Sequence, residues 1–135
     1  MIRSFRTEDT EGVVALWEAA GLVRPWNDPY EDIASKADMG DDLFLVAETE
    51  SKVVGSVMAG YDGHRGWLYY LAVLPDHQGS GLGRALVEEA EGRLAFLGCP
   101  KVNLQIRSDN TEVAAFYEKL GYTPDAVVSY GKRIR

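Results

Sequence analysis

Short runs rich in apolar residues recur along the chain and predict β-strands. They cover residues 1–5, 43–48, 53–61, 67–74, 101–107 and 127–134. Polar turns at residues 49–52 and 62–66 separate three neighbouring runs, which predicts an antiparallel meander joined by short hairpins.

Apolar positions three or four residues apart predict helices between these runs. The first begins at Thr7, the candidate N-cap, and ends at Gly21, and the others cover residues 31–39, 82–97 and 111–120. Residues 24–29 contain prolines and an Asn-Asp pair, which predicts a loop. The strand, helix and strand within residues 67–107 predict a right-handed parallel crossover, so the chain is expected to form an α/β fold with a mixed sheet.

Composition limits the class of protein. With 135 residues, 46% of them hydrophobic and 26% charged, the chain is expected to form a single domain over residues 1–135. The net charge of −7 argues against a nucleic-acid partner and favours cationic substrates such as amines. With no membrane-spanning run and no signal-peptide pattern, we expect a cytoplasmic protein without a membrane partner. Cys99, the only cysteine, excludes an internal disulfide and favours a small buried thiol, and no metal site is expected.

Glycines at alternate positions follow Pro75 and precede the third predicted helix. The segment reads Gln-x-x-Gly-x-Gly from Gln78 to Gly83. Glycines at a helix start leave main-chain N–H groups uncovered, and with the positive end of the helix dipole these donors form an anion site. The segment has neither the Gly-Lys-Ser/Thr ending of nucleotide hydrolases nor the earlier glycine of the Rossmann fingerprint. It favours phosphate or pyrophosphate binding over a turn that needs glycine for backbone reasons alone.

The second candidate segment is the last predicted helix, which Asn110 precedes and which contains Tyr117. Asn110 stands where a helix cap belongs. Tyr117 lies near the apolar stripe, next to Phe116, and its spacing alone favours a core tyrosine whose hydroxyl is satisfied.

Taken together, the strand, Pro75, the glycine segment and the segment from Asn110 to Tyr117 resemble the acyl-CoA site of the GCN5-related N-acetyltransferases, the GNAT family. The resemblance covers nearly the whole chain. It implies a mixed, mostly antiparallel sheet of about six to seven strands, with a parallel strand-helix-strand crossover and helices on both faces. A narrower similarity, in residues 22–29, 43–48, 60–66 and 131–133, is to the bacterial YpeA-type acetyltransferases.

The resemblance implies a role for each candidate residue. Tyr117 would be the general acid that protonates the leaving CoA thiolate, and Asn110 would contact the CoA arm. The backbone of the fourth predicted strand would hold the pantetheine and the acetyl carbonyl, while the glycine segment would cradle the pyrophosphate. The implied acetyl-CoA contacts are Leu71, Ala72, Val73, Gln78, Gly79, Ser80, Gly81, Leu82, Gly83, Arg84 and Asn110.

The acceptor side is less determined. Peptide N-terminal acetyltransferases of this superfamily often have a glutamate base five residues before the motif asparagine, but this chain has Gln105, which cannot take up a proton at neutral pH. Peptide acetylation thereby loses support. The base stays open among Glu48, Asp28, Asp32 and His64, or a water relay without a dedicated residue.

The loop at residues 24–29 has two interpretations: it is a lip for the acceptor, or a rigid connector with Trp26 filling the core. The candidate substrate residues under the first interpretation are Trp26, Asp28, Asp32 and His64.

The favoured function is an N-acetyltransferase that moves the acetyl group from acetyl-CoA to a primary amine by direct attack, without an acyl-enzyme. The acceptor would be a small-molecule amine or a peptide N-terminus, and a homodimer is one expected assembly because relatives often form dimers. Two alternatives stay open. Gln105 leaves room for a non-catalytic acyl-CoA-binding module that senses the cofactor or regulates a partner. A protein that binds ATP through the glycine segment is disfavoured because the Lys-Ser/Thr pair is missing.

Overall fold

The computed structural model describes residues 1–135, which divide into two compact units, Met1–Leu104 and Gln105–Arg135. The second unit contains α4 (Thr111–Lys119). The elements of the first unit are β1 (Ile2–Ser4), the 3-10 turn η1 (Thr7–Asp9), α1 (Thr10–Ala19), α2 (Pro29–Met39), β2 (Phe44–Thr49), β3 (Lys52–Tyr61), β4 (Gly66–Val73), the 3-10 turn η2 (Pro75–His77), α3 (Leu82–Phe96) and β5 (Val102–Leu104).

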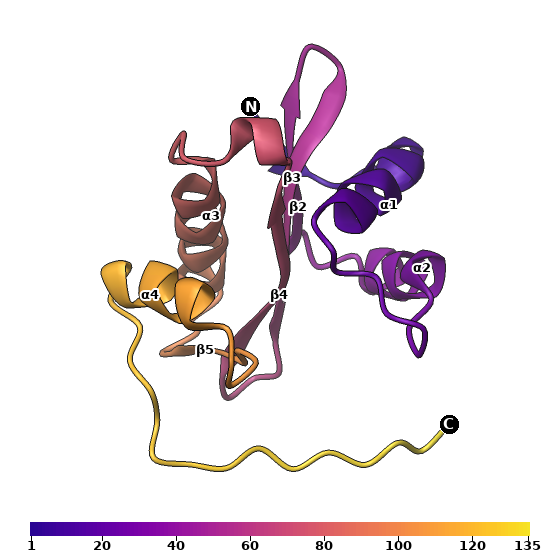
Figure 1. The fold of residues 1–135 in the computed structure, drawn as a ribbon. Coiled ribbons are helices and arrows are strands. Elements are labelled where there is room, and N and C mark those ends of the chain that lie inside the picture. Colours follow the sequence, from indigo (N-terminus) through magenta and orange to yellow (C-terminus); the bar gives the residue numbers. More distant parts are fainter. The chain divides into compact units, whose positions relative to one another are not determined.

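The first unit is built on a five-stranded sheet with the strand order β1-β2-β3-β4-β5. Neighbouring strands from β1 to β4 are antiparallel, whereas β4 and β5 are parallel. The predicted meander and the predicted parallel pair on either side of α3 are thereby confirmed. Figure 1 shows α1 and α2 on one face of this sheet and α3 on the other, so helices cover both faces.

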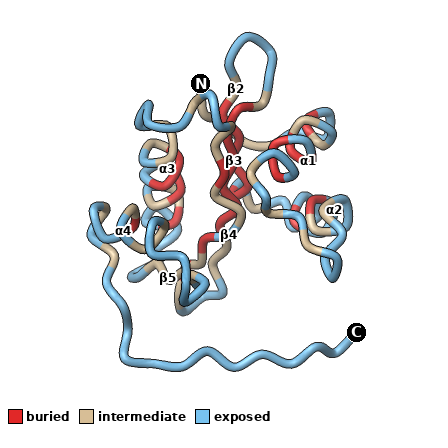
Figure 2. Tube along the Cα trace, in the orientation of Figure 1, coloured by how far each residue is buried: buried red, intermediate tan, exposed pale blue.

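Both faces of the sheet contribute to the core, as the buried stretches in Figure 2 show. On the α1–α2 face, Phe44 and Val46 of β2 pack in one cluster with Trp17 of α1 and Ile33 of α2. Side chains alternate along a strand, so Leu45, which is also fully buried, points to the opposite face. β2 therefore reads as a continuous apolar run, as expected for a strand that is covered on both sides.

α3 covers the other face of the sheet with an apolar stripe, of which Leu86, Ala90 and Leu94 are fully buried. The end of this helix approaches β4 closely. A Cβ on Gly66 would stand 2.8 Å from the Sγ of Cys99 and 3.1 Å from the Cδ1 of Leu94, so the approach requires glycine. Cys99 itself is partly buried. None of the helices has the length and apolarity that a membrane span requires.

The starts of the first two helices differ from the prediction. Thr7 does not cap α1, because residues 7–9 form the 3-10 turn, and α1 begins at Thr10. α2 begins at Pro29, two residues before the predicted start. Proline is tolerated there because the first helical N–H group has no acceptor within the helix, and Asp28 supplies the cap.

The predicted last strand, residues 127–134, is wrong, and the sheet has five strands instead of six to seven. The segment contains apolar residues but forms no ladder, and Val127 and Tyr130 are 77% and 93% exposed. β-propensity without a partner strand does not stabilise a strand, and the second unit contains none. The predicted strand at residues 101–107 is likewise shortened to Val102–Leu104.

Candidate functional site

The glycine segment forms the turn between β4 and α3. After η2, Gly79 and Gly81 adopt φ angles of +80° and +84°. No atom lies within 4 Å of a Cβ built on either glycine, so the backbone conformation, not the available space, requires glycine. The Nε2 of Gln78 donates to the main-chain oxygen of Val73 at 3.1 Å and ties this turn back to β4.

The main-chain N–H groups of residues 79–84 have no acceptor elsewhere in the protein. Gly81 is the N-cap of α3 and has no side chain to cover them, and the first turn carries no acidic residue. Uncovered N–H groups and the positive end of a helix of 15 residues create a site for an anion. The segment therefore fits a diphosphate, and binding of that group stays a prediction.

Beyond residue 68, β4 has a neighbouring strand on only one side within the first unit. β5 pairs with residues 66–68 alone, whereas β3 continues beside β4 as far as Val73. The N–H group of Leu74 bonds to the oxygen of Val54 at 2.9 Å, so strand alternation directs the main-chain groups of Val73 away from β3. This open edge includes the N–H group of Val73, whose oxygen already accepts from Gln78, and it falls within residues 71–73, the positions that the family resemblance gives to the pantetheine and acetyl carbonyl.

A β-bulge interrupts β4 at Tyr70. One residue separates Ser56 from Met58 in β3, but two residues separate their partners, Ala72 and Tyr69, in β4. Tyr70 has a φ of +54°, a left-handed conformation that is rare for a bulky residue and typical of some bulges.

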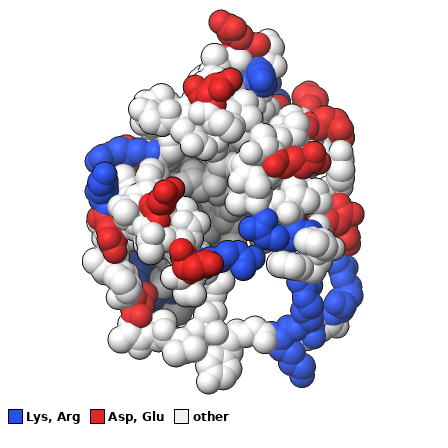
Figure 3. Space-filling model, in the orientation of Figure 1, with Lys and Arg blue, Asp and Glu red and all other residues white.

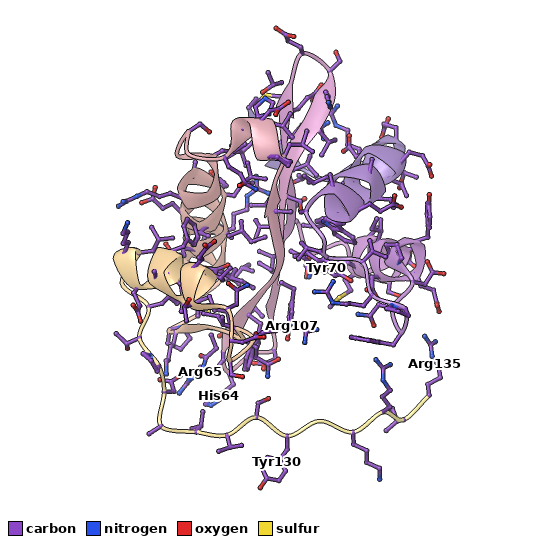
Figure 4. All side chains as sticks on the ribbon, in the orientation of Figure 1. His64, Arg65, Tyr70, Arg107, Tyr130 and Arg135 are labelled. Atoms are coloured by element: carbon purple, nitrogen blue, oxygen red, sulfur yellow. The ribbon has the colours of Figure 1, made fainter.

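The bulge reverses the faces to which the side chains of β4 point. Gly66 faces α3, because a Cβ there would contact Leu94. Regular alternation would turn Tyr70 and Ala72 toward α3 as well, yet both pack in the α1–α2 cluster. Figure 4 shows Tyr70 on the side of the sheet where α1 and α2 lie.

Three contacts hold Tyr70 in place. Its ring stacks on Trp17 with the ring centroids 3.7 Å apart and the planes 7° from parallel. Its main-chain oxygen accepts a hydrogen bond of 2.8 Å from the hydroxyl of Ser56, which accepts one of 2.9 Å from the Nε1 of Trp17. Its own hydroxyl donates to the Oδ2 of Asp32 at 2.6 Å. Burial raises the pKa of the Tyr70 phenol well above its ordinary value, so the hydroxyl stays a donor at neutral pH.

The other acceptor-side candidates are not gathered around Tyr70. Trp26 is 55% exposed, so the interpretation of this ring as a core plug is wrong. Asp28 caps α2, and Glu48 bonds to an arginine of β1 at 2.9 Å. His64 lies exposed in the β3–β4 hairpin loop, away from Tyr70 in Figure 4. Of the candidate bases, only Asp32 contacts the bulge.

In the second unit, α4 carries the other predicted pair. The Oδ1 of Asn110 accepts the N–H group of Val113 at 3.1 Å, which confirms Asn110 as a helix cap. Tyr117 is 6% exposed and meets the rings of Phe116 and Tyr122 edge-on, with the centroids 5.1 and 5.5 Å away. Its hydroxyl makes no hydrogen bond, unlike that of the core tyrosine expected from spacing alone. Burial raises the pKa of Tyr117 to about 12.

Gln105 begins the second unit, and its side-chain amide donates to the hydroxyl of Ser129. An amide has no proton-accepting role at neutral pH, so this position offers no base. No group of three or more His, Cys, Asp or Glu side chains is arranged to hold a metal ion.

Residues 11–122 match the sequence model of the acetyltransferase (GNAT) family. The chain belongs to the GNAT family. An acetyltransferase of Sodalis glossinidius is 53% identical over 134 residues, which cover 98% of this chain and 94% of the relative. An acetyltransferase of Pectobacterium atrosepticum is 51% identical over 133 residues, with 98% of this chain and 94% of the relative covered.

Solved structures agree with this assignment to the GNAT acetyltransferases. The crystal structure of the ribosomal-protein-S18-alanine N-acetyltransferase from Escherichia coli matches with a TM-score of 0.74 and 26% identity, over 90% of this chain and 76% of that chain. The GNAT family match runs through both compact units. The single domain over residues 1–135 and the YpeA-type similarity stay predictions.

Proposed function

We propose that this GNAT acetyltransferase transfers the acetyl group of acetyl-CoA to a primary amine, carried by a small molecule or a peptide N-terminus. The observation that carries the proposal is the run of main-chain N–H groups at residues 79–84 without acceptors, at the start of a long helix. Such donors suit the diphosphate of CoA. When bound, acetyl-CoA supplies an activated thioester, which a neutral amine attacks directly.

On the donor side, the proposal gives the diphosphate to Gly79, Ser80, Gly81, Leu82, Gly83 and Arg84, with Gln78 fixing the turn. The open edge of β4 at residues 71–73 supports a second contact. Main-chain donors there would polarise the acetyl carbonyl and stabilise the charge that develops on its oxygen. Asn110 would add a contact to the CoA arm through the amide nitrogen that its capping bond leaves unused.

For Tyr117 we propose the role of general acid toward the leaving sulfur. Its hydroxyl has no protein partner, and a pKa of about 12 keeps the phenol protonated at neutral pH. As the amine nitrogen bonds to the carbonyl carbon, the C–S bond breaks, the amine loses a proton to solvent or a base, and Tyr117 gives its proton to sulfur. The phenol then regains a proton from solvent.

The test is release of free CoA thiol from acetyl-CoA in the presence of a panel of amines. Tyr117→Phe should lower kcat about 10²- to 10⁴-fold, the usual contribution of a positioned acid, and change the affinity for CoA much less. Tyr130→Phe is the matched control, because this tyrosine is 93% exposed. An unchanged kcat in Tyr117→Phe would exclude the acid role.

Gln105 favours one alternative, a non-catalytic module that binds acyl-CoA, because it removes the base of some relatives. The same panel separates the two functions. A sensor would bind acetyl-CoA with the wild-type loop yet release no thiol with any amine.

A further inference from the structure

Asp32 is a partly buried carboxylate without a positive partner. Its only side-chain hydrogen bond comes from the neutral hydroxyl of Tyr70, on Oδ2, and its Oδ1 accepts no hydrogen bond. Other shielded acids of the first unit are matched: Asp9 and Glu48 bond to one arginine, and Asp41 bonds to Lys36. Oδ1 of Asp32 is thus a free acceptor at a half-buried position that solvent reaches, and a cation from outside the chain would form a stronger ion pair there than at a fully exposed carboxylate.

The position of this carboxylate is fixed. The ring of Tyr70 stacks on Trp17, and its main-chain oxygen accepts a hydrogen bond from the hydroxyl of Ser56. These contacts hold Tyr70 in a left-handed conformation, which only a well-determined environment maintains. The hydroxyl of Tyr70 then holds Oδ2 of Asp32 at 2.6 Å, so Oδ1 is presented in a set direction. Fixed groups bind a ligand at a lower entropic cost than mobile ones.

The carboxylate lies on the acceptor side but not at the reacting carbon. Tyr70 directly precedes residues 71–73, the proposed thioester positions, and a whole tyrosine side chain separates that backbone from Asp32. An ammonium bound at Asp32 is therefore a second group of the acceptor. This arrangement suits the chemistry, because a carboxylate at the reacting nitrogen would favour the protonated amine, which cannot attack.

The surrounding charge agrees with a cationic ligand. Residues 7–39, which contain α1 and α2, include two cations, Arg24 and Lys36, and eight carboxylates, of which Asp9 is paired with Arg3 outside this range: Glu8, Asp9, Glu11, Glu18, Asp28, Glu31, Asp32 and Asp38. Figure 3 shows acidic side chains over the part of the surface where Figure 1 draws these helices. Such a field attracts polycations and raises their association rate.

We propose that Asp32, positioned by Tyr70, binds a second ammonium group of the acceptor, so that the acceptor class is a diamine or an amine with another cationic group. This inference rests on the proposed acetyl transfer and narrows its substrate. Asp32 is the binding residue, and Tyr70 is a positioning residue that acts through it.

The experiment compares 1,4-diaminobutane with 1-aminobutane, which has the same chain length and one charge fewer. In the wild type, the diamine should have a KM about 10- to 100-fold lower, the value of one charge-assisted hydrogen bond. Asp32→Asn should abolish this preference by raising the KM of the diamine to that of the monoamine. Tyr70→Phe should weaken the preference selectively, whereas loss of packing alone would impair both amines equally.

Asp38→Asn is the matched control, since it removes the same charge from an exposed position on the same helix. Calorimetric titration of 1,4-diaminobutane into wild type and Asp32→Asn, with circular dichroism to verify folding, gives a readout without turnover. Diamine binding that is equal in both proteins overturns the inference, as does an equal KM for both amines. Failure of the whole amine panel to release thiol overturns the acetyl transfer instead, and the titration still decides on Asp32.

Discussion

Substituting Gly81 by alanine tests whether the anion site depends on the backbone conformation of the glycine segment or on the space that the missing side chain leaves. Gly81 has a φ of +84°, and no atom lies within 4 Å of an added Cβ, so alanine meets no steric obstacle. The penalty is conformational only, about 1–2 kcal/mol for an L-residue held in the left-handed region. Part of it is offset by the lower entropy of the unfolded chain, about 0.4–1 kcal/mol, which leaves a net loss of roughly 1 kcal/mol.

Gly92 supplies the matched control within the same helix. It lies in the interior of α3, is exposed, has no positive φ, and also has no atom within 4 Å of an added Cβ. Gly92→Ala should therefore stabilise the protein by about 0.5–1 kcal/mol, through helix propensity. The same substitution is thus expected to lower stability at the N-cap of α3 and to raise it in the interior of this helix.

The measurements are thermal unfolding, urea titration and CoA titration by calorimetry. For a chain of this size, about 1 kcal/mol corresponds to roughly 3–5 °C in Tm, so Gly81→Ala should melt lower and Gly92→Ala higher than wild type. CoA affinity should fall about tenfold or more in Gly81→Ala, because a relaxed φ turns the N–H groups away, and stay unchanged in Gly92→Ala. A shift of both Tm values in one direction would refute the conformational argument, and full CoA affinity in a destabilised Gly81→Ala would refute the anion site.

Three further predictions concern stability. Ser56→Ala should cost about 2–5 kcal/mol in urea unfolding, because the N–H of Trp17 and a main-chain oxygen of β4 lose their buried partner, and a loss below about 0.5 kcal/mol would contradict this. Arg3 holds the pKa of Asp9 below its ordinary value. The ionised Asp9 therefore stabilises the fold above about pH 4, and this contribution is lost as the pH falls through the folded-state pKa. In Asp9→Asn, the free energy of unfolding should change less with pH on the acid side than in wild type. Tyr117, with its pKa raised to about 12, stabilises below about pH 10 and loses this contribution as the pH rises toward 12, so Tyr117→Phe should flatten the alkaline limb of a pH titration of stability.

The features predictable from the sequence are those that short-range rules decide. Gly79 and Gly81 adopt positive φ in the predicted turn because only glycine does so without strain, and Asn110 caps α4 through a residue three positions away. The starts of the first two helices and the absence of a last strand do not follow from such local rules. Residues 127–134 have some β-propensity, but a strand needs a partner, which local sequence does not reveal.

The contact between Asp32 and Tyr70 could not be predicted from the sequence for a different reason. The two residues are 38 positions apart, and Tyr70 reaches Asp32 only because of the bulge. Counting alternate positions from Gly66, which faces α3, assigns Tyr70 to the wrong face of the sheet. No residue of β4 signals the bulge, since Tyr70 is not a glycine and its left-handed φ depends on contacts with α1 and β3.

This bulge gives one strand two roles. Its extra residue turns the side chain of Tyr70 toward the α1–α2 face, while the following residues, 71–73, keep an open main-chain edge. In the proposed reaction, main-chain groups of residues 71–73 bind the donor, and Asp32 binds the acceptor, positioned by Tyr70 directly before that segment. The donor contacts proposed for residues 71–73 are main-chain contacts, whereas recognition of the acceptor depends on the side chains of Tyr70 and Asp32. The acceptor specificity of this chain should therefore change through substitutions on the α1–α2 face without loss of CoA binding, because the two recognition surfaces share a backbone but no side chain.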